Sequence, residues 1–127
     1  MKAIFTTEGP APAGHYSQAI EAGGFVFVSG MLPGPGVATD GPDNFERQVR
    51  AALEHCRRVL AAADCGLDAV VQCTAYIVGV EHWPEFNRIY ADVFGDHRPA
   101  RAVVPVPELH YGFLVELQMT AYKSPAA

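Results

Sequence analysis

The spacing of apolar residues along the chain separates two helices from the rest of the sequence. Between residues 45 and 63 the apolar residues recur every three or four positions with charged residues between them, which predicts an amphipathic helix. The same spacing returns over residues 83–93. There Pro84 suits the first turn of a helix and Gly95 suits its end.

Six shorter segments are rich in β-branched and aromatic residues, which predicts strands. Gly23 and Gly24 favour a hairpin turn between the second and third of them, because glycine adopts positive φ at no steric cost. Residues 8–14 and 31–44 contain too much proline and glycine for regular structure and are expected to be loops. The predicted strands are 2–6, 15–22, 25–30, 69–79, 101–106 and 113–122.

The resulting order, β-β-β-α-β-α-β-β, predicts a single α+β domain over residues 1–127, with both helices on one face of a six-stranded sheet. Residues 25–28 are apolar on both faces, so this strand is expected to be covered on both sides. In 113–122 the odd positions are apolar and suit the helices, whereas the even positions, which include Glu116, are mixed. Two helices cannot cover both faces, and an uncovered half-apolar face predicts that subunits pack sheet to sheet.

The composition argues against several classes of function and of site. The chain of 127 residues carries a net charge of −5, and its nine basic residues are scattered, which disfavours nucleic acid as a partner. Its three cysteines form no Cys-x-x-Cys pair and its histidines show no ligand spacing, so neither a disulfide framework nor a metal site is expected. No apolar stretch approaches the roughly 18 residues of a membrane helix, and no signal-peptide pattern is visible, which favours the cytoplasm.

Arg101 and Glu116 are the candidate catalytic residues. Arg101 opens the apolar run 102–106, an unusual place for a guanidinium, and Glu116 follows 15 positions later. A hairpin through 107–112 would make their strands antiparallel neighbours, so that both side chains share one pocket or line two sides of it once subunits assemble. A guanidinium binds a carboxylate through two charge-assisted hydrogen bonds, and a carboxylate can polarise a water molecule. The pair therefore suits a small acidic substrate that is attacked by water.

Simpler structural roles remain open for the same residues. Arg101 is equally well explained by an ion pair with Glu116 that closes a strand edge, and a glutamate in a half-exposed strand is commonly only solvated. Ser29 at a strand end is expected to hydrogen-bond its own backbone. The residues expected to serve packing are Tyr16, Cys73, Trp83 and Phe86.

Four segments carry a family resemblance: GHYSQA (14–19), FVFVSGMLP (25–33), FNRIYADVFGDHRPAR (86–101) and FLVELQMTA (113–121). On these segments the chain resembles the Rid (YjgF) family of reactive-intermediate deaminases over nearly its full length. The combination of Pro-Ala-Arg with a glutamate 15 positions later is the most specific part of the resemblance.

The resemblance implies a fold like that of the Bacillus chorismate mutase, with a mixed six-stranded sheet, two helices on one face, and a homotrimer whose sheets pack inward. It implies that enamine or imine acids of the 2-aminoacrylate type are hydrolysed to 2-oxo acids and ammonium, in clefts between subunits and without a cofactor. Arg101 would bind the substrate carboxylate and Glu116 would position the water. The resemblance places further substrate-binding residues at Tyr16, Ser29, Gly30, Met31, Asn87 and Val103.

The chain also departs from the family pattern. His15 stands in place of a proline, Met31 in place of a glutamine, and Val103 in place of a cysteine; residues 110–113 differ as well. These changes predict a pocket altered in polarity and shape, suited to a larger or aromatic imine of a dedicated pathway. Two other functions stay open: a non-catalytic trimer that binds small carboxylates or partner proteins, and the ribonuclease activity often attached to the family, which the acidic composition disfavours.

Overall fold

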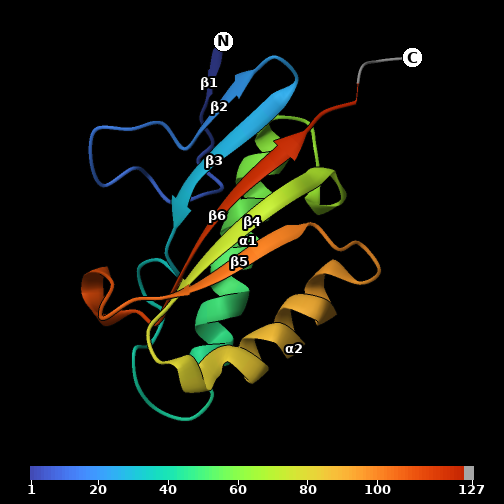
Figure 1. The fold of residues 1–127 in the computed structure, drawn as a ribbon. Helices are drawn as coiled ribbons and strands as arrows, with labels where there is room; N and C mark the ends of the chain where they lie inside the picture. The colour runs from blue at the N-terminus through green and yellow to red at the C-terminus, as the bar shows by residue number, and fades with distance from the viewer. Residues whose placement is uncertain (125–127) are drawn as a thin grey trace.

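Both helices lie on one face of a six-stranded sheet in the computed structural model, which describes residues 1–124 (Figure 1). The predicted α+β architecture is thereby confirmed. In the sheet the strands run in the order β1-β2-β3-β6-β4-β5, so β1 and β5 form its two edges. The elements are β1 (Lys2–Ile4), β2 (Ala19–Ala22), β3 (Phe25–Met31), α1 (Asn44–Ala62), β4 (Val70–Ile77), α2 (Trp83–Phe94), β5 (Ala100–Pro105) and β6 (Val115–Tyr122).

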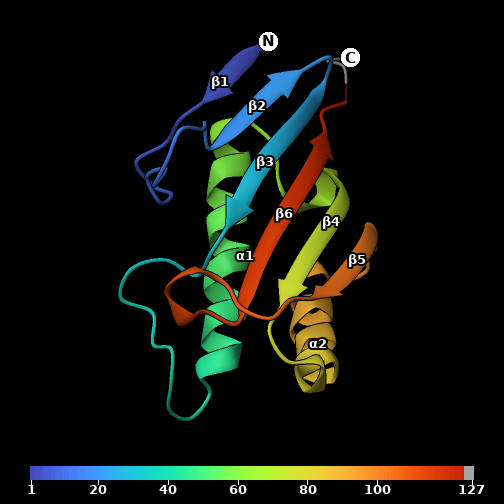
Figure 2. The same cartoon turned by 60° about the vertical axis from the view of Figure 1, so that its left-hand side comes forward.

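The apolar stripe of α1 packs on the centre of the sheet, where β3 and β6 lie side by side (Figure 2). Its charged residues face away from the sheet, and three of its arginines pair with glutamates on the same helix. The buried side chains of the stripe are those of Phe45, Val49, Ala52, Leu53, Cys56, Val59 and Leu60. Burial of this apolar surface, and not the weak exposed ion pairs, holds α1 against the sheet.

The last strand alternates as its sequence predicts. Val115, Leu117, Met119 and Ala121 are buried beneath the helices. Glu116 lies on the other face of β6, opposite Tyr76 of β4, and is half-buried. The sheet therefore has a helix-covered face and a face that this chain leaves open.

The predicted hairpin between the last two strands is wrong. β5 does not pair with β6; it pairs in parallel with β4, and β4 lies between them. The chain runs from β4 through α2 into β5, and a helix is the usual crossover that lets two strands run parallel. β5 is consequently an edge strand, a position that tolerates Pro105 because its missing N–H is not needed by a neighbour on the outer side.

The open face carries an aromatic cluster made of Phe25, Phe27 and Tyr122. The Phe25 ring lies 5.0 Å from the Tyr122 ring and 6.1 Å from the Phe27 ring, and Phe27 is 48% exposed. Of the strand expected to be covered on both sides, only Val26 and Val28 are buried in this chain. Cover for the other side would have to come from another copy, so that part of the expectation stays a prediction.

Of the four residues expected to serve packing, two are buried as expected, and two are not, because Tyr16 is 50% exposed and Trp83 is exposed to a similar degree. Phe86 and Cys73 are fully buried, but Trp83 is 48% exposed. Trp83 is the first residue of α2, where the helix emerges beside the edge strand β5 (Figure 1). No strand lies beyond β5 to cover the indole, so helical spacing alone overstated its burial.

Within residues 1–124 no helix has both the length and the apolar character needed to cross a membrane. The same part of the chain brings no three His, Cys, Asp or Glu side chains close enough together to hold a metal ion.

Candidate functional site

Arg101 faces the helices from the edge of the sheet. It is in register with Cys73 of β4, whose side chain is buried on that face. The guanidinium carbon lies 4.9 Å from the centre of the Tyr90 ring and 5.8 Å from that of Phe86, a cation–π arrangement. Among residues 1–124 no carboxylate lies within 4.0 Å of its nitrogens. The aromatic rings thus fix the guanidinium while its hydrogen-bonding groups stay available for an anion.

Cys73 and Tyr90 are ionisable side chains that lie next to Arg101 on the helix-covered face. Burial raises the pKa of the Cys73 thiol to about 11, although the nearby Tyr90 hydroxyl and the Arg101 cation oppose this shift. Burial likewise raises the pKa of Tyr90. Both groups are therefore neutral at physiological pH, and the positive charge of Arg101 is not cancelled from below.

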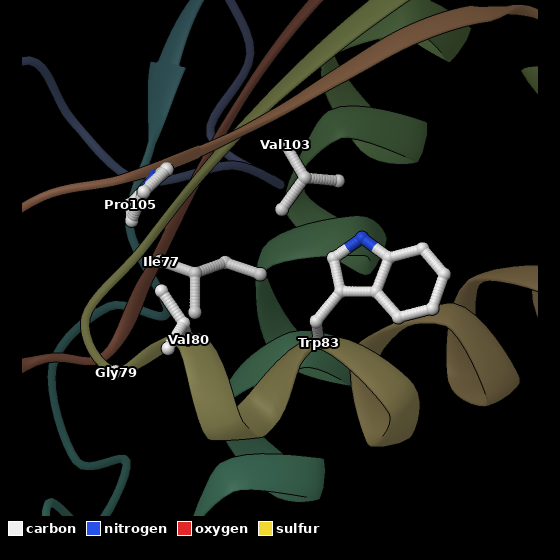
Figure 3. A pocket seen from close by; sticks show the side chains of 6 residues that line it. All are labelled: Ile77, Gly79, Val80, Trp83, Val103 and Pro105. Atoms are coloured by element: carbon white, nitrogen blue, oxygen red, sulfur yellow. The ribbon is translucent and has the colours of Figure 1, made fainter.

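Val103 and Asn87 lie on the same side of the sheet as Arg101. Val103 is two positions further along β5 and therefore points to the same face, where it packs against the core. Asn87 is half-buried on α2, one turn after Trp83. Beside Val103 lies a hollow of about 270 Å³, shown in Figure 3 and lined by Ile77, Gly79, Val80, Trp83, Val103 and Pro105. We call Arg101, Val103 and Asn87 the helix-side group.

Glu116 belongs to a second set of residues on the open face. A methyl group placed on Gly30 would lie 2.7 Å from Glu116 Oε2, closer than any van der Waals contact allows. Gly30 sits where the pairing of β3 with β6 is interrupted between Val28 and Met31. The absence of a side chain at Gly30 therefore makes room for the carboxylate over β3.

Met31 is placed differently from the rest of the predicted site. Its side chain is buried among the core residues, and it pairs with Leu117 on the helix-covered face. Only the backbone of Met31 remains near the open-face residues.

Ser29 completes the open-face group, together with Gly30 and Glu116, and Tyr16 lies in the segment that leads into β2. Tyr16 is half exposed, and its hydroxyl accepts a hydrogen bond from the Ala13 N–H at 3.2 Å. The Ser29 hydroxyl donates to the carbonyl of Ser17 at 2.6 Å. Ser29 thus bonds a neighbouring segment and not its own backbone, which corrects the simpler expectation for this residue and ties it to the strand that follows Tyr16.

Two buried glutamines support the open-face group, and the sequence reasoning missed both. Gln18 is 1% exposed; its amide donates to the carbonyls of Thr6 (3.1 Å) and Pro10 (2.8 Å) and accepts the Thr6 N–H (2.7 Å). These bonds hold the segment that precedes Tyr16. The signal was present in GHYSQA, where a polar residue directly precedes an apolar strand.

Gln48 of α1 does the same for the start of β6. It is fully buried, donates to the Ala38 carbonyl at 3.1 Å and accepts the Leu114 N–H at 2.8 Å. Its side chain thus fixes the backbone two residues before Glu116. A glutamine three positions after Phe45, within the apolar stripe of a helix, was the available signal.

The structure therefore divides the predicted site residues between the two faces of one sheet. Arg101 does not form the ion pair with Glu116 that its sequence position allows, because β4 separates their strands and the side chains point to opposite faces. A small ligand on one copy can touch the helix-side group or the open-face group, but not both.

Comparison with known proteins gives a consistent result. The family model described as endoribonuclease L-PSP matches residues 6–123. A RutC family protein of Pyrococcus horikoshii is 37% identical over 121 residues, which cover 94% of this chain and 96% of the relative. A RutC family protein of Aquifex aeolicus is 36% identical, with 97% and 100% of the two chains covered.

Solved structures share the fold. A protein described as a putative endoribonuclease from Thermotoga maritima superposes with a TM-score of 0.89 at 31% identity, covering 98% of this chain and 99% of that one. YyfA of the Rid protein family from Yersinia pestis gives a TM-score of 0.88 at 35% identity, covering 95% and 98%. Escherichia coli TdcF, solved with bound serine, gives 0.88 at 27% identity, covering 98% and 100%.

Proposed function

This chain belongs to the endoribonuclease L-PSP family, also called the Rid, YjgF or RutC family, and from this premise we propose that it hydrolyses small enamine or imine acids to 2-oxo acids and ammonium. The main support for this proposal is Arg101. A guanidinium held over two aromatic rings, with no carboxylate partner among residues 1–124, is suited to bind the carboxylate of a ligand. The serine bound to TdcF is itself a small carboxylate, which supports this ligand class.

The proposed site is completed between two copies of the chain. The helix-side group lies at the β5 edge and the open-face group lies on the far side of the sheet. In a closed homotrimer, the open face of one copy packs beside the β5 edge of the next, which brings Arg101 of one copy near the Glu116 of another. The exposed cluster of Phe25, Phe27 and Tyr122 supports such packing, because burying it removes apolar surface from water.

The residues then divide the reaction between them. Arg101 orients the substrate and offsets its negative charge. A 2-aminoacrylate gains a proton at its methylene carbon and loses one from nitrogen to become the imine, whose carbon is electrophilic without any cofactor. Glu116 accepts a proton from water as the oxygen attacks that carbon, and returns it to nitrogen. The hydroxyl proton of the resulting carbinolamine moves to nitrogen as the C–N bond breaks, which gives the carbonyl of the 2-oxo acid and ammonia, and the ammonia takes up a proton from solvent to become ammonium.

A coupled assay tests this function. An amino-acid oxidase or a serine dehydratase supplies the imine or enamine, and release of the 2-oxo acid is followed with and without the protein. We expect acceleration by the wild type and its loss in Arg101→Ala and Glu116→Gln. Arg98→Ala, which removes an exposed arginine three positions earlier, is the matched control and should behave as wild type. Equal rates with and without the protein would reject the deaminase.

A carboxylate-binding protein without turnover is the second candidate, and it rests on the same guanidinium, which has no carboxylate partner within the described residues 1–124. It predicts that small 2-oxo acids raise the melting temperature of the wild type but not of Arg101→Ala, while the coupled assay shows no acceleration.

The ribonuclease activity in the family's name has less support from this chain. Its net charge is −5, and the arginines of α1 and α2 are largely paired with carboxylates, as Arg50 and Arg88 are with Glu46. Salt-sensitive binding of RNA would argue for it.

A further inference from the structure

The hollow beside Val103 lies on the same side of the sheet as Arg101. We propose that it binds the side chain of the substrate, so that the protein prefers imino acids with a branched aliphatic or aromatic side chain over 2-aminoacrylate. This inference rests on the proposed function and names the substrate class that the site takes.

The first argument for this inference is the position of the hollow relative to Arg101. Arg101, Val103 and Pro105 alternate along β5 toward one face, so consecutive members are about 7 Å apart. Val103 and Pro105 both line the hollow. A carboxylate on Arg101 therefore lies about one such step from Val103, the nearest β5 wall of the hollow. That distance suits a side chain of leucine or phenylalanine size, and it is too long for the methylene group of 2-aminoacrylate.

The second argument is the chemistry of the side chains that line the hollow. The walls are formed by the side chains of Ile77, Val80, Trp83, Val103 and Pro105, none of which bears a charge (Figure 3). Trp83 and Val80 at the rim are 48% and 70% exposed, an unusual state for a neighbouring indole and valine. An apolar side chain placed between them would remove this surface from water, whereas a polar one would find only the indole N–H of Trp83 as a side-chain partner in the walls.

The third argument is the size of the hollow, which limits what can bind in it. At about 270 Å³ it falls just below the roughly 300–1,000 Å³ of pockets that enclose drug-sized ligands. It suits one amino-acid side chain next to a cation that holds its carboxylate. Trp83 and Val103 thus act as specificity residues.

The test compares imines made by an oxidase from leucine, phenylalanine and alanine. For the wild type we expect kcat/KM for the leucine or phenylalanine imine to exceed that for the alanine imine about tenfold or more, the usual effect of a few buried methylene groups. Trp83→Ala, which removes one wall, and Val80→Phe, which fills the hollow from its exposed rim, should each bring this ratio close to one. Phe5→Ala removes an exposed aromatic residue next to the opposite edge strand and should leave the ratio unchanged.

Stable 2-oxo acids separate this inference from the proposed function. If no imine is turned over, the deaminase fails, and the Kd values of pyruvate and 4-methyl-2-oxopentanoate then test the hollow alone; tighter binding of the branched acid, abolished by Val80→Phe, supports it. If imines are turned over but the ratio is near one in the wild type, or is unmoved by Trp83→Ala and Val80→Phe, the inference is overturned while the deaminase stands. Light scattering monitors assembly, because a variant that dissociates would lose turnover of every imine; dissociation of both Trp83→Ala and Val80→Phe would mark the hollow as a packing surface and overturn the inference.

Discussion

Arg101 and Glu116 point to opposite faces of the same sheet. Arg101 is in register with Cys73 on the helix-covered face, whereas Glu116 is in register with Tyr76 on the open face. Because β4 lies between their strands, no rotamer of either side chain brings the two together within one chain. A reaction that needs both residues must use two copies of the chain, and this requirement leads to the first two predictions.

Mixing two inactive variants should restore activity. Arg101→Ala supplies an intact Glu116 and Glu116→Ala supplies an intact Arg101. In a trimer with random mixing, about one quarter of the sites receive both residues from adjacent copies. Co-expression of equal amounts should therefore give about a quarter of the wild-type rate in the coupled assay. A site contained in one copy predicts no recovery, and that result would contradict the intersubunit arrangement.

Charge on the open face should prevent assembly. Phe27→Glu places a carboxylate in the cluster with Phe25 and Tyr122, where packing against another copy would have to bury it. We expect a lower molecular mass by light scattering and loss of turnover, with a circular dichroism spectrum like that of the wild type. Ala61→Glu, on the exposed surface of α1, provides the control and should assemble normally. An unchanged mass for Phe27→Glu would show that this face is not the interface.

A side chain at Gly30 should displace the Glu116 carboxylate. The added methyl group of Gly30→Ala meets Oε2 at 2.7 Å, and the backbone at Gly30 does not have positive φ, so alanine is allowed there. We expect kcat to fall by about 100-fold, the usual cost of moving a reacting group by about 1 Å. In the Glu116→Ala background the same change should cost almost nothing further. Independent, multiplicative losses in the double variant would argue that Gly30 acts in another way.

Loss of the Gln18 hydrogen bonds should loosen the segment that precedes Tyr16. Gln18→Met keeps the length of the side chain but removes its hydrogen bonds to Thr6 and Pro10. We expect the free energy of unfolding to fall by about 1–3 kcal/mol, since buried backbone groups lose their partners. Urea unfolding measures the loss, and hydrogen exchange should be faster at residues 6–16. A stability equal to that of the wild type would show that water replaces the amide without cost.

Stability should fall at alkaline pH because of Cys73. Burial raises the pKa of its thiol from 9.0 to about 11, so the unfolded chain loses this proton at a lower pH than the folded protein. The contribution is fully present below pH 9 and is lost as the pH rises toward 11, by about 2–3 kcal/mol in total. Urea unfolding at a series of pH values should show this decline, with a shallower slope in Cys73→Ala. A slope that is unchanged in Cys73→Ala would assign the decline to other groups.

The sequence determined the elements of this fold and the residue types of its site. The apolar period of three to four residues located α1 and α2, and the alternation in β6 placed Glu116 on the face away from the helices, because a side chain's direction follows directly from the local backbone period. Arg101 was identified from its contrast with the apolar residues that follow it, and by family resemblance.

Only the tertiary structure decided which of these residues meet. Strand order depends on contacts between distant segments, so local pattern could not show that β4 separates β5 from β6 and turns Arg101 away from Glu116. The burial of Gln18 and Gln48 and the exposure of Trp83 likewise depend on what the rest of the chain places around them. Local periodicity fixes the direction of a side chain, but the packing of distant segments fixes its neighbours, and the chemistry of this site depends on those neighbours.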